Sequence, residues 1–458
     1  MNKIKCFSLA VSALFALAFV FSCSKTEEQP ELPVEDNSSS SAGNATASNP
    51  VSAYGALKAC KINGIGYICG SDFYDSIPVQ VRGVSLGWSN TGWESAIFFN
   101  DITINAMVDH WKAEIIRVPL GAGDNGSYLF SAQRASNKDR VITAIEAAIA
   151  KDVYVIIDWH SHAAHTSNQK ELAKEFFSEM AQTYGHLDNV IFEIYNEPVC
   201  SDGASSCGSA QRTTWAEIKS YAEEIISVIR EHSQNLILVG TPNWDQNVNA
   251  VLTSPGPLED GNVAYVFHFY AATHSLNSYS SRINSVRDAG YPIFVTEYGT
   301  VASNGNGTHN EPSSDAWMDY LNTNIISYCA WHVNYKNEAS AFFVPAFRPT
   351  ADAEWANTSY MNASGEYIYN NLVSWHDSAT WRTGNIPQLP SNASNPPASG
   401  SGNYCYYGAC SNWAADEWSC VGGGGCYRMP TDDNCISGTL VESCPLDARA
   451  PSAPAGYY

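Results

Sequence analysis

The middle of the chain contains eight short apolar runs, each of strand length and each continuous rather than alternating with polar residues. A continuous apolar run is typical of a strand that is buried on both faces, as in a parallel sheet. The predicted strands are 79–87, 114–120, 153–160, 190–197, 236–241, 263–270, 293–299 and 326–332.

Stretches with helical periodicity separate most of these runs, among them 139–151, 169–184 and 215–231. Eight strands that alternate with helices predict an α/β fold, and specifically a (β/α)8 TIM barrel. An open, doubly wound sheet is the alternative. No glycine-rich phosphate loop follows the first strand, and this weakens that alternative.

The segments that flank the predicted barrel have a different composition. Residues 23–53 are rich in Ser, Asn, Glu and Pro, and residues 381–403 are rich in Pro, Ser, Asn and Gly, so neither segment can support a core. The expected order is an export signal at 1–22, a tether at 23–53, the barrel at 54–380, a linker at 381–403, a small cysteine-rich module at 404–446 and a tail at 447–458.

The export signal has a positive start, Lys3 and Lys5, and then an apolar run that is too short to span a bilayer comfortably. Ser22 and Cys23 follow this run and resemble the cleavage site of a bacterial lipoprotein. Cys23 is therefore the expected lipidation site, with ordinary cleavage nearby as the alternative. We expect an exported protein that is either held at the bacterial cell surface or outer membrane by this lipid alone, or secreted.

The chain has 13 cysteines, of which one belongs to the export signal and one is the lipidation site, leaving 11. In an oxidising environment most of these are expected to form disulfides. Cys329 lies in an apolar stretch and is expected to be a buried, unreactive thiol. Two pairs are close in sequence and close short loops: Cys60 with Cys69, and Cys200 with Cys207.

The module at 404–446 contains the last six cysteines, which allow fifteen disulfide connectivities. A chain this short needs such cross-links because it cannot bury a sufficient core. Tyrosines and tryptophans lie between the cysteines, and in so small a module some of them must be exposed. We expect either a carbohydrate-binding face or a structural or protein-docking module.

The formal net charge of the chain is −22. Nucleic-acid-binding proteins need a basic surface to displace counterions, so this charge argues against nucleic acid as a partner. Aromatic residues make up 12% of the chain and charged residues only 15%. Sugar rings stack on aromatic faces, so a neutral polysaccharide fits this composition, although a well-packed core fits it equally.

Polar and aromatic residues replace aliphatic ones where the predicted strands end. In a TIM barrel the carboxyl-terminal ends of the strands form the face on which active sites lie. Two strands end with the carboxylates Glu197 and Glu297, which a purely structural barrel does not need. The other candidates on this face are Arg117, Asp158, His160, Asn196, His268, Tyr270 and Trp331.

Several of these residues have simpler interpretations as well. A single glutamate at a strand end is often an exposed rim residue or a helix-capping partner. Asp158 lies within an apolar run and is expected to be structural, paired with Arg117. The group His160, His162 and His165 matches no standard zinc spacing, so no metal site and no cofactor are predicted.

Taken together and in order, these residues resemble glycoside hydrolase family 5, and most of all its bacterial endoglucanase branch. The resemblance covers residues 55–375. Asn-Glu-Pro alone is moderately specific, whereas the whole ordered set is highly specific. The matching segments are Val81-Arg82-Gly83-Val84-Ser85, Ile116-Arg117, Asp158-Trp159-His160, Tyr195-Asn196-Glu197-Pro198, Phe267-His268-Phe269-Tyr270 and Val295-Thr296-Glu297-Tyr298-Gly299.

The resemblance implies a retaining endo-β-1,4-glucanase in which Glu197 is the general acid/base and Glu297 the nucleophile. A retaining enzyme needs two carboxyl groups about 5 Å apart, one ionised for attack and one protonated for the leaving oxygen. Arg117 can hold Glu297 ionised by charge pairing, and the Tyr270 hydroxyl can hydrogen-bond to it. The supporting residues implied by the family are Arg117, His160, Asn196, His268 and Tyr270, with Asn196 suited to the sugar 2-hydroxyl.

Lys336 and Glu338 follow Trp331 at the offsets found in the endoglucanase branch, where these residues contact sugars. This favours a β-glucan over mannan as the substrate. We expect the protein to be a monomer. Two alternatives remain open. The same mechanism can act on mannan, xyloglucan or mixed-linkage glucan, or the protein can be a non-catalytic surface protein that binds glycans.

Two positions depart from the family pattern. The loop at 87–93 lacks the histidine that is common in the endoglucanase branch, and Tyr298 stands where tryptophan is frequent. Either departure can change the sugar preference. Trp88 and Trp93 in this loop are candidates for stacking on sugar rings, with core packing as the alternative.

Overall fold

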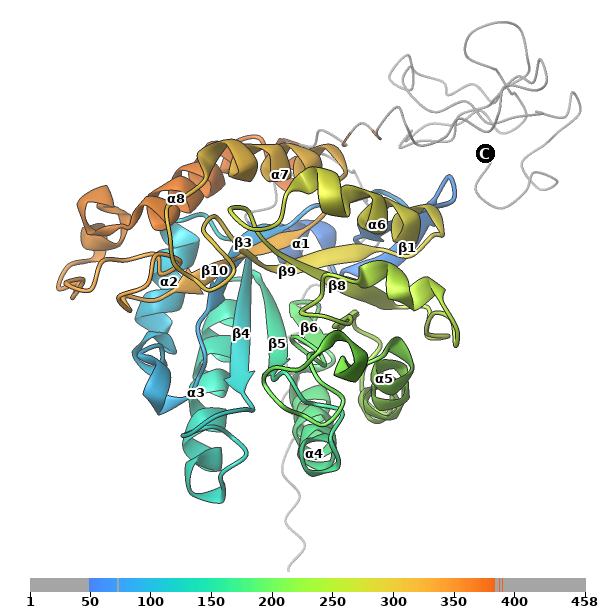
Figure 1. The fold of residues 1–458 in the computed structure, drawn as a ribbon. Helices are drawn as coiled ribbons and strands as arrows, with labels where there is room; N and C mark the ends of the chain where they lie inside the picture. Colours follow the sequence, from blue (N-terminus) through green and yellow to red (C-terminus); the bar gives the residue numbers. More distant parts are fainter. Residues whose placement is uncertain (1–48, 72–73, 384–386, 388, 390–458) are drawn as a thin grey trace, which may run out of the picture. The chain divides into compact units, whose positions relative to one another are not determined.

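The computed structural model describes residues 49–71, 74–383, 387 and 389 (Figure 1). Eight parallel strands form a closed barrel in the order β10-β3-β4-β5-β6-β7-β8-β9. Figure 1 shows helices such as α3, α4 and α5 on the outside of the strands. The predicted α/β class and (β/α)8 TIM barrel are therefore confirmed.

The barrel strands are β3 (Arg82–Leu86), β4 (Ile115–Gly121), β5 (Tyr154–His160), β6 (Val190–Glu193), β7 (Ile237–Val239), β8 (Val263–Tyr270), β9 (Ile293–Gly299) and β10 (Tyr328–Val333). The α-helices are α1 (Pro50–Tyr54), α2 (Asp101–Asp109), α3 (Ser131–Ala150), α4 (Ser167–Tyr184), α5 (Trp215–Arg230), α6 (Leu276–Asp288), α7 (Glu311–Thr323), α8 (Ala363–His376) and α9 (Thr380–Thr383). Short 3-10 helices lie at Thr91–Trp93, Ala96–Phe98, Ser209–Gln211, Val248–Leu252, Asp352–Ala356 and Thr358–Tyr360.

Each of the eight predicted strands is present, but two ends differ in a way that matters for the site. β6 stops at Glu193, so Asn196 and Glu197 lie beyond the strand rather than at its last positions. β4 continues to Gly121, so Arg117 lies in the middle of the strand instead of at its end, as was predicted. The apolar runs predict where the strands lie, because buried strands need apolar side chains. They do not predict the residue at which backbone hydrogen bonding between strands ends.

Alternate residues of each strand face the two sides of the barrel wall. Along β5, Val155 and Ile157 belong to the apolar cluster shared with the outer helices. Tyr154 and Ile156 belong to the cluster inside the barrel. Each such fully buried side chain contributes about 1.5–3 kcal/mol to stability. Asp158 and His160 continue the inward-facing series, which is why polar groups gather at one end of the interior.

The predicted helices are also present. The periodic stretch at 215–231 forms α5, which begins after Thr214. The Thr214 side chain accepts a hydrogen bond from the Glu217 backbone N–H, and the Glu217 carboxylate accepts one from the Thr214 backbone N–H. This capping box satisfies donors that a helix start otherwise leaves unpaired. The stretch predicted at 139–151 starts eight residues earlier, because α3 spans Ser131–Ala150.

A two-stranded hairpin, β1 (Lys58–Ile62) and β2 (Ile65–Cys69), precedes the barrel. The expected disulfide joins its strands, Cys60 to Cys69, with an S–S distance of 2.01 Å. The second expected disulfide, Cys200 to Cys207, closes the loop that follows Glu197. Cys329 is free and buried, as predicted, and burial raises the pKa of its thiol, so it is unreactive.

Residues 49–54 and 380–383 belong to the folded part of the chain. Helix α1 covers the last residues assigned to the tether, with Val51 buried, and Trp381 of α9 is buried as well.

The export signal, Cys23 and the six-cysteine module lie outside the described residues, so their structure stays a prediction. In the part of the chain that the structure describes, no helix has the length and apolarity needed to cross a bilayer.

Candidate active site

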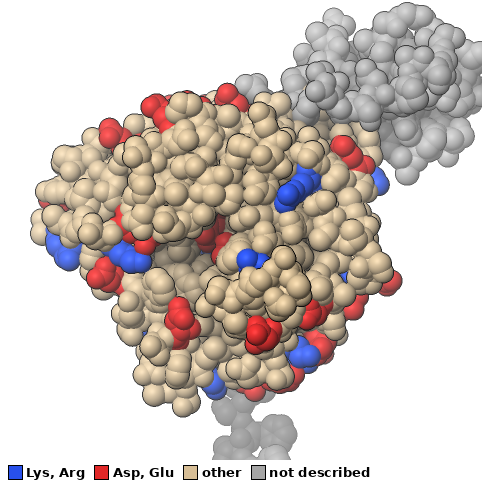
Figure 2. Space-filling model, in the orientation of Figure 1, with Lys and Arg blue, Asp and Glu red and all other residues tan. Residues whose placement is uncertain are grey.

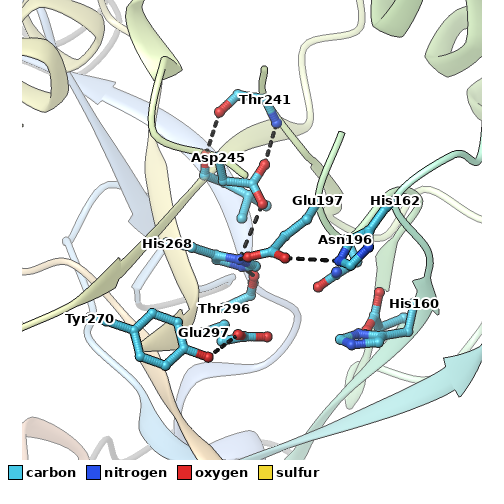
Figure 3. Close-up of polar contacts among 12 residues, drawn as sticks. His160, His162, Asn196, Glu197, Thr241, Asp245, His268, Tyr270, Thr296 and Glu297 are labelled. Carbon is cyan, nitrogen blue, oxygen red and sulfur yellow. Dashed lines mark hydrogen bonds and ion pairs between the residues drawn. The ribbon is translucent and has the colours of Figure 1, made fainter. Parts of the chain in front are cut away.

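The predicted site residues meet at the carboxyl-terminal ends of the barrel strands. Figure 2 shows a hollow on one face of the molecule with acidic side chains inside it. Strands β8 and β9 pair in a register that sets His268 beside Glu297. Figure 3 shows Glu197, His268, Tyr270 and Glu297 converging from three different segments of the chain.

Glu297 is buried, and both of its carboxylate oxygens accept hydrogen bonds. Arg117 Nη1 donates to one oxygen at 3.1 Å, and the Tyr270 hydroxyl donates to the other at 2.6 Å. Both contacts were predicted from the sequence. A guanidinium and a phenol that donate to the two oxygens stabilise the ionised carboxylate, which is the form a nucleophile needs.

Arg117 is fully buried and is the centre of a network of acidic groups. It contacts Glu193 Oε2 at 2.7 Å through Nε and Asp158 Oδ2 at 3.0 Å through Nη2. Burial alone lowers the pKa of Arg117, but the charges of Asp158, Glu193 and Glu297 outweigh it and raise this pKa well above its usual value. The guanidinium therefore stays charged, and the expected pairing with Asp158 is present.

Glu193 is a member of this network that the sequence reasoning missed. It lies in β6 between apolar residues, is fully buried, and accepts hydrogen bonds from Arg117 and from the Thr296 hydroxyl at 2.7 Å. The signal was available, because a carboxylate inside a continuous apolar run must be paired with a charged or hydrogen-bonding group.

Glu197 lies opposite Glu297 and is held by two imidazoles. His268 Nδ1 is 3.0 Å from Glu197 Oε1, and His162 Nε2 is 3.2 Å from Oε2. Burial by itself raises the pKa of Glu197, but the hydrogen bonds and charges of the two histidines, while these are protonated, lower it below its usual range. Both oxygens of Glu197 therefore have an imidazole partner.

His162 was not among the predicted site residues. Burial lowers the pKa of His162, but its hydrogen bond to Glu197 and the nearby carboxylates outweigh burial and raise it. The three neighbouring histidines have separate partners: His160 contacts Asp158 at 2.7 Å, His162 contacts Glu197 at 3.2 Å and His165 contacts the Tyr195 hydroxyl at 2.7 Å.

Glu197 and Glu297 each have a carboxylate oxygen within 4.8 Å of the other, and a nitrogen of His268 lies within the same distance of both. Three such groups are also a possible metal-ligand set. Both nitrogens of His268 and both oxygens of Glu297 already have hydrogen-bond partners in the protein. This set, already hydrogen-bonded within the protein, fits a catalytic pair of carboxyl groups better than coordination of an ion.

Asn196 presents a donor to the site. Its Oδ1 accepts a hydrogen bond from Arg117 Nη2 at 2.6 Å, which fixes the amide. Its Nδ2 is buried and has no hydrogen-bond partner among the described residues. A buried donor without a partner is costly, and a ligand hydroxyl at this point would satisfy it.

His160 and Trp331 form one wall of the site. Their rings are parallel, with centroids 5.4 Å apart. Burial, followed by the charge of Arg117, lowers the pKa of His160 well below its usual value, so the ring is neutral. Trp88 packs edge-on against His160 with a centroid distance of 4.4 Å.

The structure also brings together four other residues that were predicted to bind sugar, Trp88, Trp93, Lys336 and Glu338. Lys336 Nζ is 2.6 Å from Glu338 Oε2 and 4.8 Å from the Trp93 ring centre. Trp93 stacks on Trp88 at 5.5 Å. Neither indole is fully buried, which favours the sugar-stacking interpretation over core packing.

A groove of about 720 Å³ continues from Trp93. Phe130 lies in this groove with 47% of its surface exposed. An exposed ring beside amide and carboxylate groups has the chemistry of a carbohydrate surface. The residues that line the groove are Gly92, Trp93, Asp124, Asn125, Leu129, Phe130 and Asn168.

Comparisons with known proteins agree with this geometry. Endoglucanase Z of Dickeya dadantii is 39% identical over 295 residues, covering 64% of this chain and 62% of that protein. Endoglucanase A of Evansella cellulosilytica is 35% identical over 301 residues, covering 64% of this chain and 56% of that protein. The chain thus matches about three fifths of the length of these relatives.

A solved structure of a Thermobifida fusca endoglucanase catalytic domain in complex with cellotetraose superimposes with a TM-score of 0.57 at 30% identity, covering 71% of this chain and 99% of that one. The family model described as "Cellulase (glycosyl hydrolase family 5)" matches residues 74–337, which is more than half of the chain. The chain therefore belongs to the cellulase family, glycosyl hydrolase family 5.

Proposed function

We propose that this protein is an endo-β-1,4-glucanase that hydrolyses internal bonds of β-glucan with retention of anomeric configuration. The observation that carries the proposal is the pair of carboxylates Glu197 and Glu297, whose nearest oxygens lie within 4.8 Å. Inverting enzymes hold the two carboxyl groups about 6.5–9.5 Å apart to admit a water, whereas retaining enzymes hold them about 5–5.5 Å apart.

In the first step Glu297 attacks the anomeric carbon, and the bond from this carbon to the leaving oxygen breaks. Glu197 gives its proton to that oxygen. Arg117 and Tyr270 each donate a hydrogen bond to one oxygen of Glu297 and so orient this carboxylate for the attack. The free Nδ2 of Asn196 is suited to the sugar 2-hydroxyl, where hydrogen bonds strengthen toward the transition state.

In the second step water attacks the same carbon, and the ester bond to Glu297 breaks. Glu197 now accepts a proton from this water. Formation of the ester removes the negative charge of Glu297, and the departed proton leaves Glu197 ionised, so it can act as a base. The surrounding histidines stabilise that ionised form.

The choice of β-glucan rests on the sugar-binding side of the cleft. The Trp93, Lys336 and Glu338 cluster offers an aromatic face beside a cation and a carboxylate, which suits a chain of neutral sugars. The relatives that match are named endoglucanases, and one structural relative binds cellotetraose. Mannan, xyloglucan and mixed-linkage glucan remain the alternative substrates.

A substrate panel tests this choice. We expect the full chain to release reducing ends from carboxymethyl-cellulose at least about tenfold faster than from galactomannan or xyloglucan, which corresponds to about 1.4 kcal/mol in the transition state. The Glu297→Ala variant serves as the blank for each substrate. Preference for galactomannan or xyloglucan would refute the glucan assignment while keeping the mechanism. Binding without turnover of any polysaccharide would favour a non-catalytic glycan-binding protein.

A further inference from the structure

The connection between β7 and β8 carries a carboxylate into the site that the mechanism does not use. Three consecutive residues in this connection, Asn243, Trp244 and Asp245, have φ values of +64°, +53° and +60°. Non-glycine residues rarely adopt this left-handed region, and three in succession are strained. Strain of this kind is retained where the surrounding structure holds a functional group in place.

The middle residue of the turn, Trp244, is anchored by two contacts. The Trp244 backbone N–H donates to the Pro198 carbonyl at 3.2 Å, and the Arg212 guanidinium lies 4.1 Å from the Trp244 ring centre. Pro198 directly follows Glu197 in the chain. The turn that presents Asp245 is therefore fixed to the segment that presents the acid/base candidate.

Asp245 is fully buried, and its carboxylate faces His268, the residue that also contacts Glu197 (Figure 3). Its Oδ1 accepts the backbone N–H of Thr241. Its Oδ2 lies 3.2 Å from His268 Nδ1 but has no hydrogen bond of good geometry within the described part of the chain. An ionised oxygen in this position is poorly compensated, and burial, followed by the charge of Glu197, raises the pKa of Asp245 well above its usual value.

The same nitrogen of His268 serves Glu197. The Thr296 hydroxyl donates to Glu193, so it accepts from His268 Nε2 at 2.8 Å, and that nitrogen carries a hydrogen. His268 Nδ1 then faces Glu197 Oε1 at 3.0 Å and Asp245 Oδ2 at 3.2 Å. One imidazole nitrogen is therefore shared by two carboxyl groups.

We infer that Asp245 is a positioning residue that acts through His268 to keep Glu197 protonated at higher pH than Glu197 would manage alone. This rests on the proposed function, because only a general acid needs its proton before the reaction. Two neighbouring carboxyl groups cannot easily both ionise, so the last proton leaves the pair at a higher pH than it would leave a single carboxyl group. Loss of that proton sets the alkaline limb of kcat/KM.

Other titratable and charged groups face this pair, and each remains in place when Asp245 alone is changed. They come from the elements packed around Glu197 and His268. They are Arg117, Asp158, His162, Glu193, His274 and Glu297.

The test is the pH profile of Asp245→Asn in the full chain. Asparagine has the shape of the protonated acid, cannot ionise, and tolerates the left-handed region well. Without a second carboxyl to hold the last proton, Glu197 loses its proton at lower pH. We expect the alkaline limb of kcat/KM on carboxymethyl-cellulose to move down by about one pH unit, with activity at the optimum changed less than about threefold.

A matched control is Glu114→Gln, which makes the same carboxyl-to-amide change at a buried residue. Glu114 precedes β4, at the opposite end of the barrel from the site, and contacts the Arg82 backbone. This variant should leave the alkaline limb where it is in the wild type. An unshifted limb in Asp245→Asn, or an equal shift in Glu114→Gln, would overturn the inference.

A substrate with a good leaving group separates this inference from the proposed function. Dinitrophenyl cellobioside needs no proton from Glu197 to release its phenolate, so its alkaline limb should be the same in wild type and Asp245→Asn. If the wild type turns over neither substrate, the proposed function fails. If the wild type turns over both and the limb on cellulose does not move, only the role of Asp245 fails.

A second variant covers the case in which Asp245→Asn does not fold. Asp245→Gly removes the carboxyl and relieves the left-handed strain, because glycine adopts positive φ at no steric cost. It should show the same downward shift of the alkaline limb. A folded Asp245→Gly with the wild-type limb would overturn the inference.

Discussion

Replacing Glu297 with alanine is expected to reduce hydrolysis of β-glucan by at least about 10⁴-fold, because no other group can form the covalent bond to the anomeric carbon. The fold should survive, since the change removes a negative charge from a network in which Arg117 keeps Glu193 and Asp158 as partners. The measurement is release of reducing ends from carboxymethyl-cellulose, with circular dichroism to verify folding. Near-normal activity of a folded variant would contradict the nucleophile assignment.

Added azide identifies the role of the missing carboxylate. In Glu297→Ala, azide can occupy the space of the carboxylate and attack an activated aryl cellobioside from that face. The product is then the α-glycosyl azide, with inverted configuration, and its formation should restore release of the phenol. A β-glycosyl azide from this variant would mean that Glu297 and Glu197 have exchanged roles.

Replacing Glu197 with alanine is expected to slow hydrolysis of carboxymethyl-cellulose by roughly 10²–10⁴-fold, the usual contribution of general acid–base catalysis. Dinitrophenyl cellobioside should behave differently, because its leaving group needs no proton. The first step should remain fast and the second should become slow, so a burst of dinitrophenolate should precede a low steady rate. Stopped-flow absorbance measures both phases.

The control for Glu197→Ala is His274→Ala, which removes a group near the site that does not contact the carboxylate. This variant should show no burst. Azide should accelerate the steady phase of Glu197→Ala and yield the β-glycosyl azide, since it attacks the glycosyl ester from the side of the missing base. A Glu197→Ala variant that slows both substrates equally would contradict the acid/base role.

The barrel and the central carboxylates could be predicted from the sequence because burial leaves a simple pattern. The eight apolar runs reflect strands that are covered on both faces, and Glu297 stands out at the end of one of them. The contacts of Arg117 and Tyr270 with Glu297 followed from the chemistry that a nucleophile requires.

Site residues that do not lie at the ends of the predicted strands were not predicted. His162 lies in the loop after β5 and Asp245 in the turn after β7, where no apolar periodicity indicates which way a side chain points. Asp245 depends on a left-handed turn at non-glycine residues, which sequence patterns do not predict. Glu193 was overlooked because it was counted as part of an apolar run.

The positions of strand ends were the other source of error. Arg117 was placed at the end of its strand but lies in its middle, two residues after Ile115 on the inward side. Its side chain therefore rises through the barrel interior, where burial makes each of its carboxylate contacts stronger than at a solvated strand end. The sequence predicted the contact between Arg117 and Glu297 correctly, but it did not show that burial inside the barrel strengthens this contact.

The central claim is that Glu197 and Glu297 act as a double-displacement pair, and the anomeric configuration of the first product tests it most directly. Proton NMR can follow hydrolysis of a cello-oligosaccharide by the full chain during the first minutes, before mutarotation equilibrates the new reducing ends. We predict that the β-anomer appears first and the α-anomer only later. Initial release of the α-anomer would show inversion and would contradict the mechanism.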